Sequence, residues 1–296
     1  MKKIDRNSKI LVLAHNDLDA AVSSIVLQAV YTNISFTYHS FNKIDNFLEN
    51  LDYSKWDWIF IVDIHPVNDK LIDNNKIVLL DHHKSSEHLN NPSKMKFVIT
   101  SINAAMLCKR FVENMYNIKL DYLNSLVYLS MDYDLYTLKN GKSKLINDLC
   151  FFYYRPIKFR ETFKTGRTRF NKEELKWLHK RRDEYKDAWK NLEVYDLQKI
   201  NGCIVEANNF LNEIASDLMN QENYRIVFVR NPSNGRISLR HNINNFDAGT
   251  FLKEKEFGGG HELAAGIITE SDKDLQNKIN VIEEYVYNNF IETRRN

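Results

Sequence analysis

The chain has 296 residues, enough for two domains of ordinary size. Apolar residues make up 43% of it and charged residues 27%, a composition typical of a folded globular protein that excludes wholesale disorder. The 41 basic and 39 acidic side chains nearly balance, which excludes a generally basic coat for nucleic acid but not a local basic groove.

Short apolar strands alternate with helical segments in the first half of the chain. The predicted strands are 9–14, 58–62 and 76–80, and the predicted helices are 19–31, 104–115 and 122–131. Near-continuous apolar strands between helices indicate a parallel sheet covered on both faces. We therefore predict a doubly wound α/β domain over residues 1–170.

A long charged helix is predicted next, at 171–193, with one narrow apolar stripe that suits a connector over residues 171–196. The remaining residues, 197–296, are predicted to form a smaller α/β domain. Its strands are expected at 203–207, 224–230 and 236–240, and a final helix at 272–291.

The three cysteines are far apart and form no CxxC pair, so neither a disulfide framework nor a cysteine zinc site is indicated. His15, Asp17 and Asp19 interrupt the first apolar stretch before it could serve as a signal peptide. No uninterrupted apolar run reaches about 18 residues, so no membrane partner is expected. We expect a soluble, cytoplasmic protein.

Acidic and histidine residues gather in four clusters of the first domain, three of them directly after a predicted strand. The clusters are His15-Asn16-Asp17-Leu18-Asp19, Asp63 with His65, Asp81-His82-His83, and Asp132-Tyr133-Asp134. Open α/β sheets place their sites at the carboxyl ends of strands. Carboxylates grouped there are costly to bury unless cations balance them, and oxygen ligands with a few imidazoles suit Mn²⁺ or Mg²⁺. His65 is either close to the metals or, as its place before Pro66 favours, a turn residue.

The order of these clusters resembles the DHH phosphoesterase superfamily. Farther along, Phe257-Gly258-Gly259-Gly260-His261 followed by Ala264-Ala265-Gly266 resembles the GGGH…AAG pattern of its DHH-associated C-terminal domain. The resemblance covers nearly the whole chain, with both domains in the expected order. It implies an active site in the cleft between the two domains.

Two Mn²⁺ ions are implied by this resemblance, with Mg²⁺ as the alternative metal. The implied ligands form two sets that share Asp63: His15, Asp17 and Asp63 for one ion, and Asp19, Asp63, His82 and Asp132 for the other. Asp134 is an alternative to Asp132, which we favour as the first aspartate of the pair.

The implied catalytic set is Asp63, Asp81 and His83, in which Asp81 orients a ligand and His83 faces the substrate phosphate. The implied substrate-binding set consists of Gly258, Gly259, Gly260 and His261 as a backbone cradle for a terminal nucleotide or phosphate, with Arg240 on the phosphate.

The predicted activity is that of a two-metal phosphodiesterase or exonuclease that releases nucleoside monophosphates from one end of a short single-stranded oligonucleotide. The alternatives are a phosphodiesterase for cyclic or linear dinucleotides, a 3′-phosphoadenosine phosphate phosphatase, and a non-catalytic nucleotide-binding module. The basic and aromatic segment 151–170 either follows a phosphodiester backbone or packs its aromatic rings internally. The oligomeric state stays open, a homodimer included.

Overall fold

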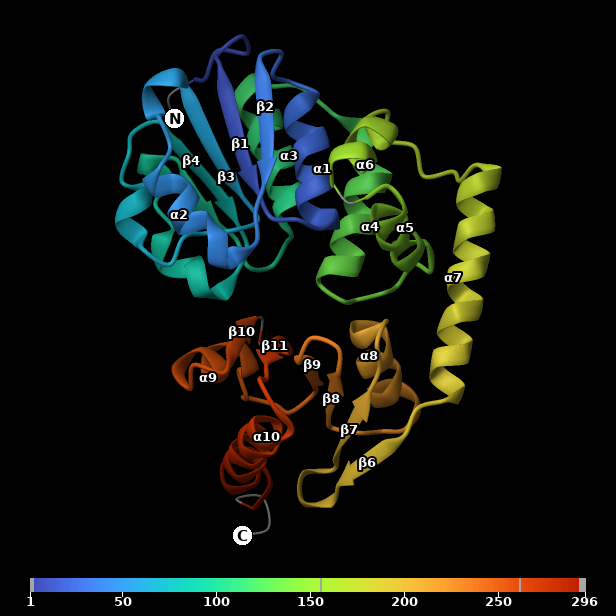
Figure 1. Ribbon diagram of the computed structural model, residues 1–296. Helices are drawn as coiled ribbons and strands as arrows, with labels where there is room; N and C mark the ends of the chain where they lie inside the picture. The colour runs from blue at the N-terminus through green and yellow to red at the C-terminus, as the bar shows by residue number, and fades with distance from the viewer. Residues whose placement is uncertain (1–2, 155, 261, 293–296) are drawn as a thin grey trace. The chain divides into compact units, whose positions relative to one another are not determined.

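The computed structural model describes residues 3–154, 156–260 and 262–292 (Figure 1). The chain divides into two compact units, and the division falls between His179 and Lys180, within helix α7 (Lys172–Lys190). Each unit has its own sheet, of five strands in the first and six in the second. The predicted α/β class is therefore confirmed, with a parallel-sheet N-terminal domain and a separate smaller sheet domain.

The sheet of the first unit is parallel throughout, in the order β2-β1-β3-β4-β5. In that order the strands are Ile34–Tyr38, Ile10–Ala14, Trp58–Val62, Ile77–Asp81 and Lys96–Val98. The three central strands match the prediction. The edge strands β2 and β5 escaped it, because β2 is only partly buried and β5 has three residues, so neither carries a strong apolar pattern.

Helices cover both faces of this sheet (Figure 1). The helices of one face are α1 (Leu18–Gln28), α3 (Ala104–Tyr116), α4 (Asn124–Asp134), α5 (Lys142–Phe152) and α6 (Pro156–Phe163). Helix α2 (Ile44–Glu49) covers the other face. Successive strand residues alternate between the faces, so Val12 joins the first core and Leu13 the second. Burial on both sides explains the near-continuous apolar runs.

The basic and aromatic segment 151–170 packs two of its phenylalanines internally, whereas Phe151 and Tyr154 are exposed. Phe159 and Phe163 are fully buried, and their rings stack with centroids 4.3 Å apart. The guanidinium of Arg167 lies 4.1 Å above the ring of Phe163. The rings of Phe159 and Phe163 are therefore closed to nucleic-acid bases. For these two residues, the alternative of internal packing holds.

Helix α7 begins with a reciprocal cap. Asn171 Oδ1 accepts from the N–H of Glu174 at 2.9 Å, and Glu174 Oε2 accepts from the N–H of Asn171 at 2.7 Å. The Glu174 carboxylate, which is fully buried, also accepts from the Tyr153 hydroxyl at 2.6 Å and from the Arg167 guanidinium at 2.5 Å. This carboxylate joins the start of α7 to the end of α5.

Replacing Glu174 with alanine should therefore lower the free energy of unfolding by about 3 kcal/mol, because the Tyr153 hydroxyl and the Arg167 guanidinium lose their buried partner. Chemical denaturation followed by circular dichroism measures the loss. The control is Glu173→Ala, since Glu173 is exposed on the same turn. Equal losses in the two variants would contradict this account.

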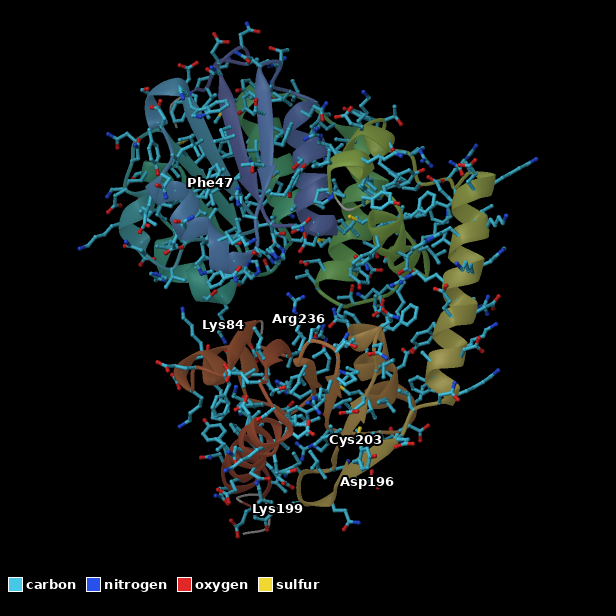
Figure 2. The ribbon with its side chains drawn as sticks, viewed as in Figure 1. Phe47, Lys84, Asp196, Lys199, Cys203 and Arg236 are labelled. Atoms are coloured by element: carbon cyan, nitrogen blue, oxygen red, sulfur yellow. The ribbon has the colours of Figure 1, made fainter. Side chains whose placement is uncertain are left out.

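The sheet of the second unit has the order β10-β11-β9-β8-β7-β6 and is antiparallel except between β7 and β8. In that order the strands are Gly258–Gly260, Ala264–Ile268, Arg236–His241, Ile226–Arg230, Gly202–Glu206 and Val194–Leu197. Cys203, on β7, is buried in the core on one face (Figure 2). The predicted strands β7, β8 and β9 are confirmed.

Helix α8 (Leu211–Gln221) packs on the face of this sheet that contains Cys203. Helices α9 (Ala248–Glu254) and α10 (Asp272–Val286) pack on the other face. The predicted final helix continues after α10 as one π-helical turn, Tyr287–Ile291. In the described part of the chain, every helix is too short or too polar to cross a bilayer.

Candidate metal centre and active site

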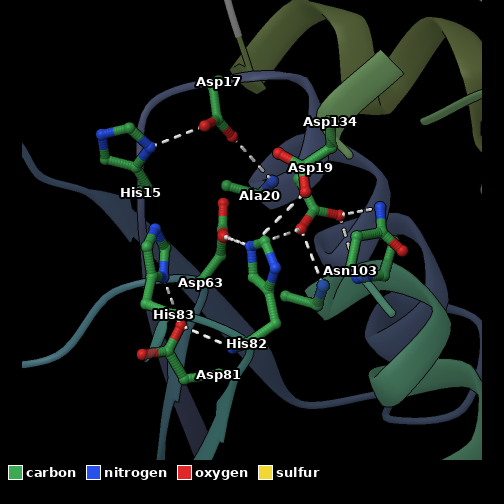
Figure 3. Close-up of polar contacts among 12 residues, drawn as sticks. His15, Asp17, Asp19, Ala20, Asp63, Asp81, His82, His83, Asn103 and Asp134 are labelled. Atoms are coloured by element: carbon green, nitrogen blue, oxygen red, sulfur yellow. Dashed lines mark hydrogen bonds and ion pairs between the residues drawn. The ribbon is translucent and has the colours of Figure 1, made fainter. Parts of the chain in front are cut away.

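The loops after β1, β3 and β4 bring the predicted acidic and histidine residues to one edge of the parallel sheet (Figure 3). The strand order reverses beside β1, because the chain passes from β1 to β2 on one side of β1 and then crosses to β3 on its other side. In open α/β sheets, binding sites form at the carboxyl ends of the strands where such a reversal occurs. The fold therefore explains why clusters far apart in the sequence meet.

Asp63, directly after β3, has a left-handed backbone conformation with φ of 59°. Aspartate is one of the few residues that tolerate it, and strained backbone of this kind is common at functional sites. The side chain is only 2% exposed. Its Oδ1 lies 3.1 Å from His82 Nε2, whereas its Oδ2 is buried with no hydrogen-bond partner among the described residues.

Three carboxylates converge on the Nε2 atom of His82. The distances are 3.1 Å from Asp63 Oδ1, 3.5 Å from Asp134 Oδ2 and 3.8 Å from Asp19 Oδ2. Like Asp63 Oδ2, the buried Asp134 Oδ2 has no hydrogen-bond partner within the described ranges. Buried carboxylate oxygens without a hydrogen-bond partner favour the binding of a cation that they can coordinate.

Asp134, and not Asp132, joins this cluster. The favoured expectation for Asp132 is corrected by its contacts, since its carboxylate accepts from Ser143 Oγ at 2.5 Å, Thr137 Oγ1 at 2.6 Å and the N–H of Lys139 at 2.9 Å. Burial works against the charged form, but these hydrogen bonds lower the pKa of Asp132 to about 2. Residues two apart on a helix point in nearly opposite directions, so only one aspartate of the pair reaches the sheet edge.

Asp19 is held by the N-terminus of α3. Its carboxylate accepts from the side-chain amide of Asn103 at 2.5 Å and from the N–H groups of Ala104 and Ala105 at 2.8 and 2.9 Å. The positive end of the helix dipole favours the carboxylate there. Asn103 is not among the predicted site residues. Its place before an apolar helical run is typical of an N-cap, but no pattern reveals a partner 84 residues away.

His15 and Asp17 lie side by side after β1, with His15 Nδ1 2.7 Å from Asp17 Oδ2. The other oxygen of Asp17 caps α1 by accepting from the N–H of Ala20 at 3.0 Å. One ligand atom from each of His15, Asp17 and Asp63 falls within a group no wider than 4.8 Å. The first implied ligand set is thus brought together.

Asp81, at the end of β4, holds two imidazoles. Its Oδ1 lies 2.7 Å from His83 Nδ1, and its Oδ2 lies 3.1 Å from His65 Nδ1. Burial opposes the charged state of both partners in the first pair, yet their attraction lowers the pKa of Asp81 well below its ordinary value and raises the pKa of His83 to about 9. Asp81 therefore orients His83. His65 is 5% exposed and lies beside Asp81 in the site, which agrees with the alternative position near the metals and not with the favoured turn residue.

The cluster carries more negative charge than its own histidines balance. Burial, and after it the neighbouring carboxylates, raise the pKa of Asp19 and of Asp134 to about 7. Burial together with Asp17 and Asp19 raises the pKa of Asp63 well above its ordinary value. A bound divalent cation would relieve this repulsion.

These residues fit divalent cations. Two of the four compact groups of ligand atoms among the described residues are His15 with Asp17 and Asp63, and Asp19 with His82 and Asp134, each within 4.8 Å. Carboxylate oxygens dominate, with one imidazole in each of these two groups. Such donor sets suit Mn²⁺ or Mg²⁺ better than the His- and Cys-rich sites of zinc.

Acid should weaken metal binding because protons compete for the same oxygens. The pKa values of Asp19 and Asp134 are about 7, so both carboxyls lose charge as the pH falls through 7. We expect the affinity for Mn²⁺ to fall at least about tenfold between pH 8 and pH 6. Calorimetric titration at pH 8, 7 and 6 measures it. A Mn²⁺ affinity that stays the same from pH 8 to pH 6 would contradict the raised pKa values.

In the second unit, the three consecutive glycines form the edge strand β10. A Cβ atom at Gly258 would lie 1.9 Å from the carbonyl oxygen of Gly266, and one at Gly260 would lie 2.6 Å from that of Ala264. Beyond its two chain neighbours, Gly259 has no atom of the described residues within 4 Å of its Cβ position, so this position leaves room for a ligand. Larger residues are thus excluded at Gly258 and Gly260.

Arg240 lies on β9, paired across the sheet with Ala264 of β11. Its Nη1 donates to the carbonyl of Leu239 at 2.9 Å. His261, the last residue of the predicted cradle, lies outside the described residues. The binding roles of Arg240 and the glycines stay predictions.

Residues 205–288 match the family profile of the DHHA1 domain. No curated protein sequence matches the chain significantly. Among solved structures, RecJ from Thermus thermophilus in complex with Mn²⁺ is similar at a TM-score of 0.57 and 14% identity, covering 95% of this chain and 52% of RecJ. The same RecJ has also been solved with Mg²⁺.

Two shorter proteins share the fold over nearly their whole length. The pGpG-specific phosphodiesterase PggH from Vibrio cholerae has a TM-score of 0.53 and 12% identity, covering 94% of this chain and 99% of PggH. An exopolyphosphatase-related protein from Bacteroides fragilis has a TM-score of 0.53 and 15% identity, covering 95% of this chain and 93% of that protein.

The domain match and the fold agree with each other. The C-terminal unit contains the DHHA1 domain, and the chain has the fold of the RecJ, PggH and exopolyphosphatase-related structures. The predicted family resemblance is confirmed.

Proposed function

We propose that the chain is a manganese-dependent phosphoesterase that hydrolyses phosphodiester bonds of short oligonucleotides and releases nucleoside monophosphates from one end. The observation that carries this proposal is the position of Asp63, which belongs to the group of His15 and Asp17, lies 3.1 Å from His82 of the other group, and has a buried Oδ2 without a hydrogen-bond partner among the described residues. A carboxylate between two such groups suits a pair of cations.

The side chains divide the work between them. His15, Asp17 and Asp63 hold one cation, and Asp63, Asp19, His82 and Asp134 hold the other. When bound, two divalent cations polarise phosphoryl oxygens and lower the pKa of a coordinated water. His83, kept protonated by Asp81, donates a hydrogen bond to the substrate phosphate.

The C-terminal unit contributes substrate capture in this proposal. Arg240 offers a planar fork of donors to a phosphate. The open space at the Cβ position of Gly259 lets a nucleotide approach its backbone closely. The placement of the active site between the two units stays a prediction.

A linear dinucleotide phosphodiesterase is the second candidate. The pGpG-specific enzyme PggH matches this chain over nearly the full length of both, whereas the chain spans only about half of RecJ. The match to the whole of PggH supports a substrate of two nucleotides. Both candidates use the same metal-binding residues and differ only in the length of the substrate.

The experiment is hydrolysis of a substrate panel in Mn²⁺, with product size read by chromatography. The panel contains a 5′-phosphorylated dinucleotide, five-residue RNA and DNA, a cyclic dinucleotide, 3′-phosphoadenosine phosphate and pyrophosphate. We expect mononucleotide release from the linear oligomers, and turnover of the dinucleotide alone would favour the second candidate. Cleavage of no phosphodiester would contradict both.

A further inference from the structure

An exposed aromatic ring lies at the edge of the sheet that carries the metal-binding residues. Phe41 follows β2 and begins the short 3-10 helix Phe41–Lys43. The chain stays paired with the sheet almost to this point, because the N–H of His39 donates to the carbonyl of Ala14, the last residue of β1, at 2.9 Å. The loop with Phe41 therefore leaves the sheet where His15 follows β1.

Only one imidazole ring separates Phe41 from His83, the residue that faces the phosphate in the proposed function. The rings of Phe41 and His65 meet edge to face at 70°, with centroids 5.4 Å apart. The ring centroid of His65 lies 6.1 Å from that of His83. In a nucleotide, a single sugar joins the phosphate to the base. A phosphate at His83 therefore brings its base within reach of Phe41.

The loop with Phe41 is also tied to the loop with His65 through the backbone. Asp45 Oδ1 accepts from the N–H of Val67 and Oδ2 from the N–H of Asn68, each at 2.9 Å. Asp45 lies in the first turn of α2, which directly follows the 3-10 helix with Phe41. The place of Phe41 beside the metal-binding edge therefore does not depend on the ring contact alone.

The ring of Phe41 is accessible to a ligand. Phe41 is 43% exposed, and Val67 in the neighbouring loop is 61% exposed. Single exposed apolar residues are common on protein surfaces, but Phe41 differs from most in its place beside residues that the proposed function assigns to metal and phosphate. A nucleobase suits such a ring, because every base has a flat π-face that can stack on an aromatic side chain.

We propose that Phe41 binds the substrate by stacking on a nucleobase, an inference that rests on the proposed function. The stacked base is remote from the bond that breaks, so the contact is equally strong before and during the reaction. Such a contact lowers KM and leaves kcat unchanged. The enzyme therefore distinguishes nucleotides from phosphodiesters that lack a base, and Phe41 has no part in metal binding.

The test measures kcat and KM in Mn²⁺ for 5′-phosphorylated di-adenylate and for its abasic analogue, in which hydrogen replaces each adenine. Mass spectrometry identifies the products. Wild type should prefer di-adenylate by at least about tenfold in kcat/KM, the effect of one stacked base. Phe41→Ala should raise the KM for di-adenylate about tenfold and leave the KM for the analogue unchanged. Phe41→Trp, which keeps an aromatic face, should retain the wild-type KM.

Tyr122→Ala is the matched control and should leave every value unchanged. Tyr122 is an exposed aromatic residue just before α4, at the opposite end of that helix from Asp134. The inference is overturned if Phe41→Ala raises KM for both compounds equally, which would indicate a purely structural role, if it raises neither, or if Phe41→Trp behaves like Phe41→Ala. If wild type cleaves neither compound, the proposed function fails and the inference with it.

Discussion

Replacing Asp63 with asparagine should lower hydrolysis of the dinucleotide at least about 1,000-fold. The carboxylate belongs to one ligand group and touches His82 of the other, so its loss disables both cation sites. Asparagine is the suitable replacement because it tolerates the left-handed backbone at this position, which alanine resists. The rate of mononucleotide release at saturating Mn²⁺ measures the effect.

Asp69→Ala provides the matched control for this experiment. Asp69 follows the same strand, but it is half-exposed and pairs with His88 on the surface at 2.8 Å. Its removal should leave turnover unchanged, since exposed pairs contribute little. Full metal-dependent activity in Asp63→Asn would show that the dinuclear assignment is wrong.

The pair Asp132→Asn and Asp134→Asn should separate stability from metal binding. Asp134→Asn should weaken Mn²⁺ binding and turnover at least about 100-fold while leaving the metal-free protein as stable as wild type, because it removes a carboxylate that its neighbours repel. Asp132→Asn should keep its Mn²⁺ affinity but lose about 2 kcal/mol of stability, because an amide cannot accept all the hydrogen bonds that this carboxylate receives.

Calorimetric titration with Mn²⁺ and denaturation of the metal-free variants measure the two effects. Both substitutions remove one charge from the same helix, so each is the control for the other. If Asp132→Asn lost metal binding and Asp134→Asn retained it, Asp132 would be the metal ligand.

Much of the fold follows from the sequence because burial on two faces leaves a strong local signal. Strands β1, β3 and β4 are entirely buried and read as apolar runs. The edge strand β2 is only partly buried, and β10 consists of glycine alone. Such strands form because they pair with a neighbouring strand. The local sequence pattern does not predict this pairing.

The candidate site was predictable where its residues end a buried strand. Asp17, Asp63 and His82 lie where the pattern placed them because the chain must leave the sheet at that edge. The choice between Asp132 and Asp134 depends on which side of α4 faces the sheet, and sequence order does not settle that. Asn103 escaped prediction, and a turn was favoured for His65, because the roles of both residues come from contacts with distant residues.

The number of Mn²⁺ ions bound per chain, measured together with dinucleotide hydrolysis in one titration, tests the central claim most directly. We predict two ions for the wild-type protein, with activity that rises as the second is bound. Asp63→Asn should bind at most one ion and remain inactive. A single ion at full activity, or hydrolysis that persists after chelation of all metal, would contradict a dinuclear centre at this edge of the sheet.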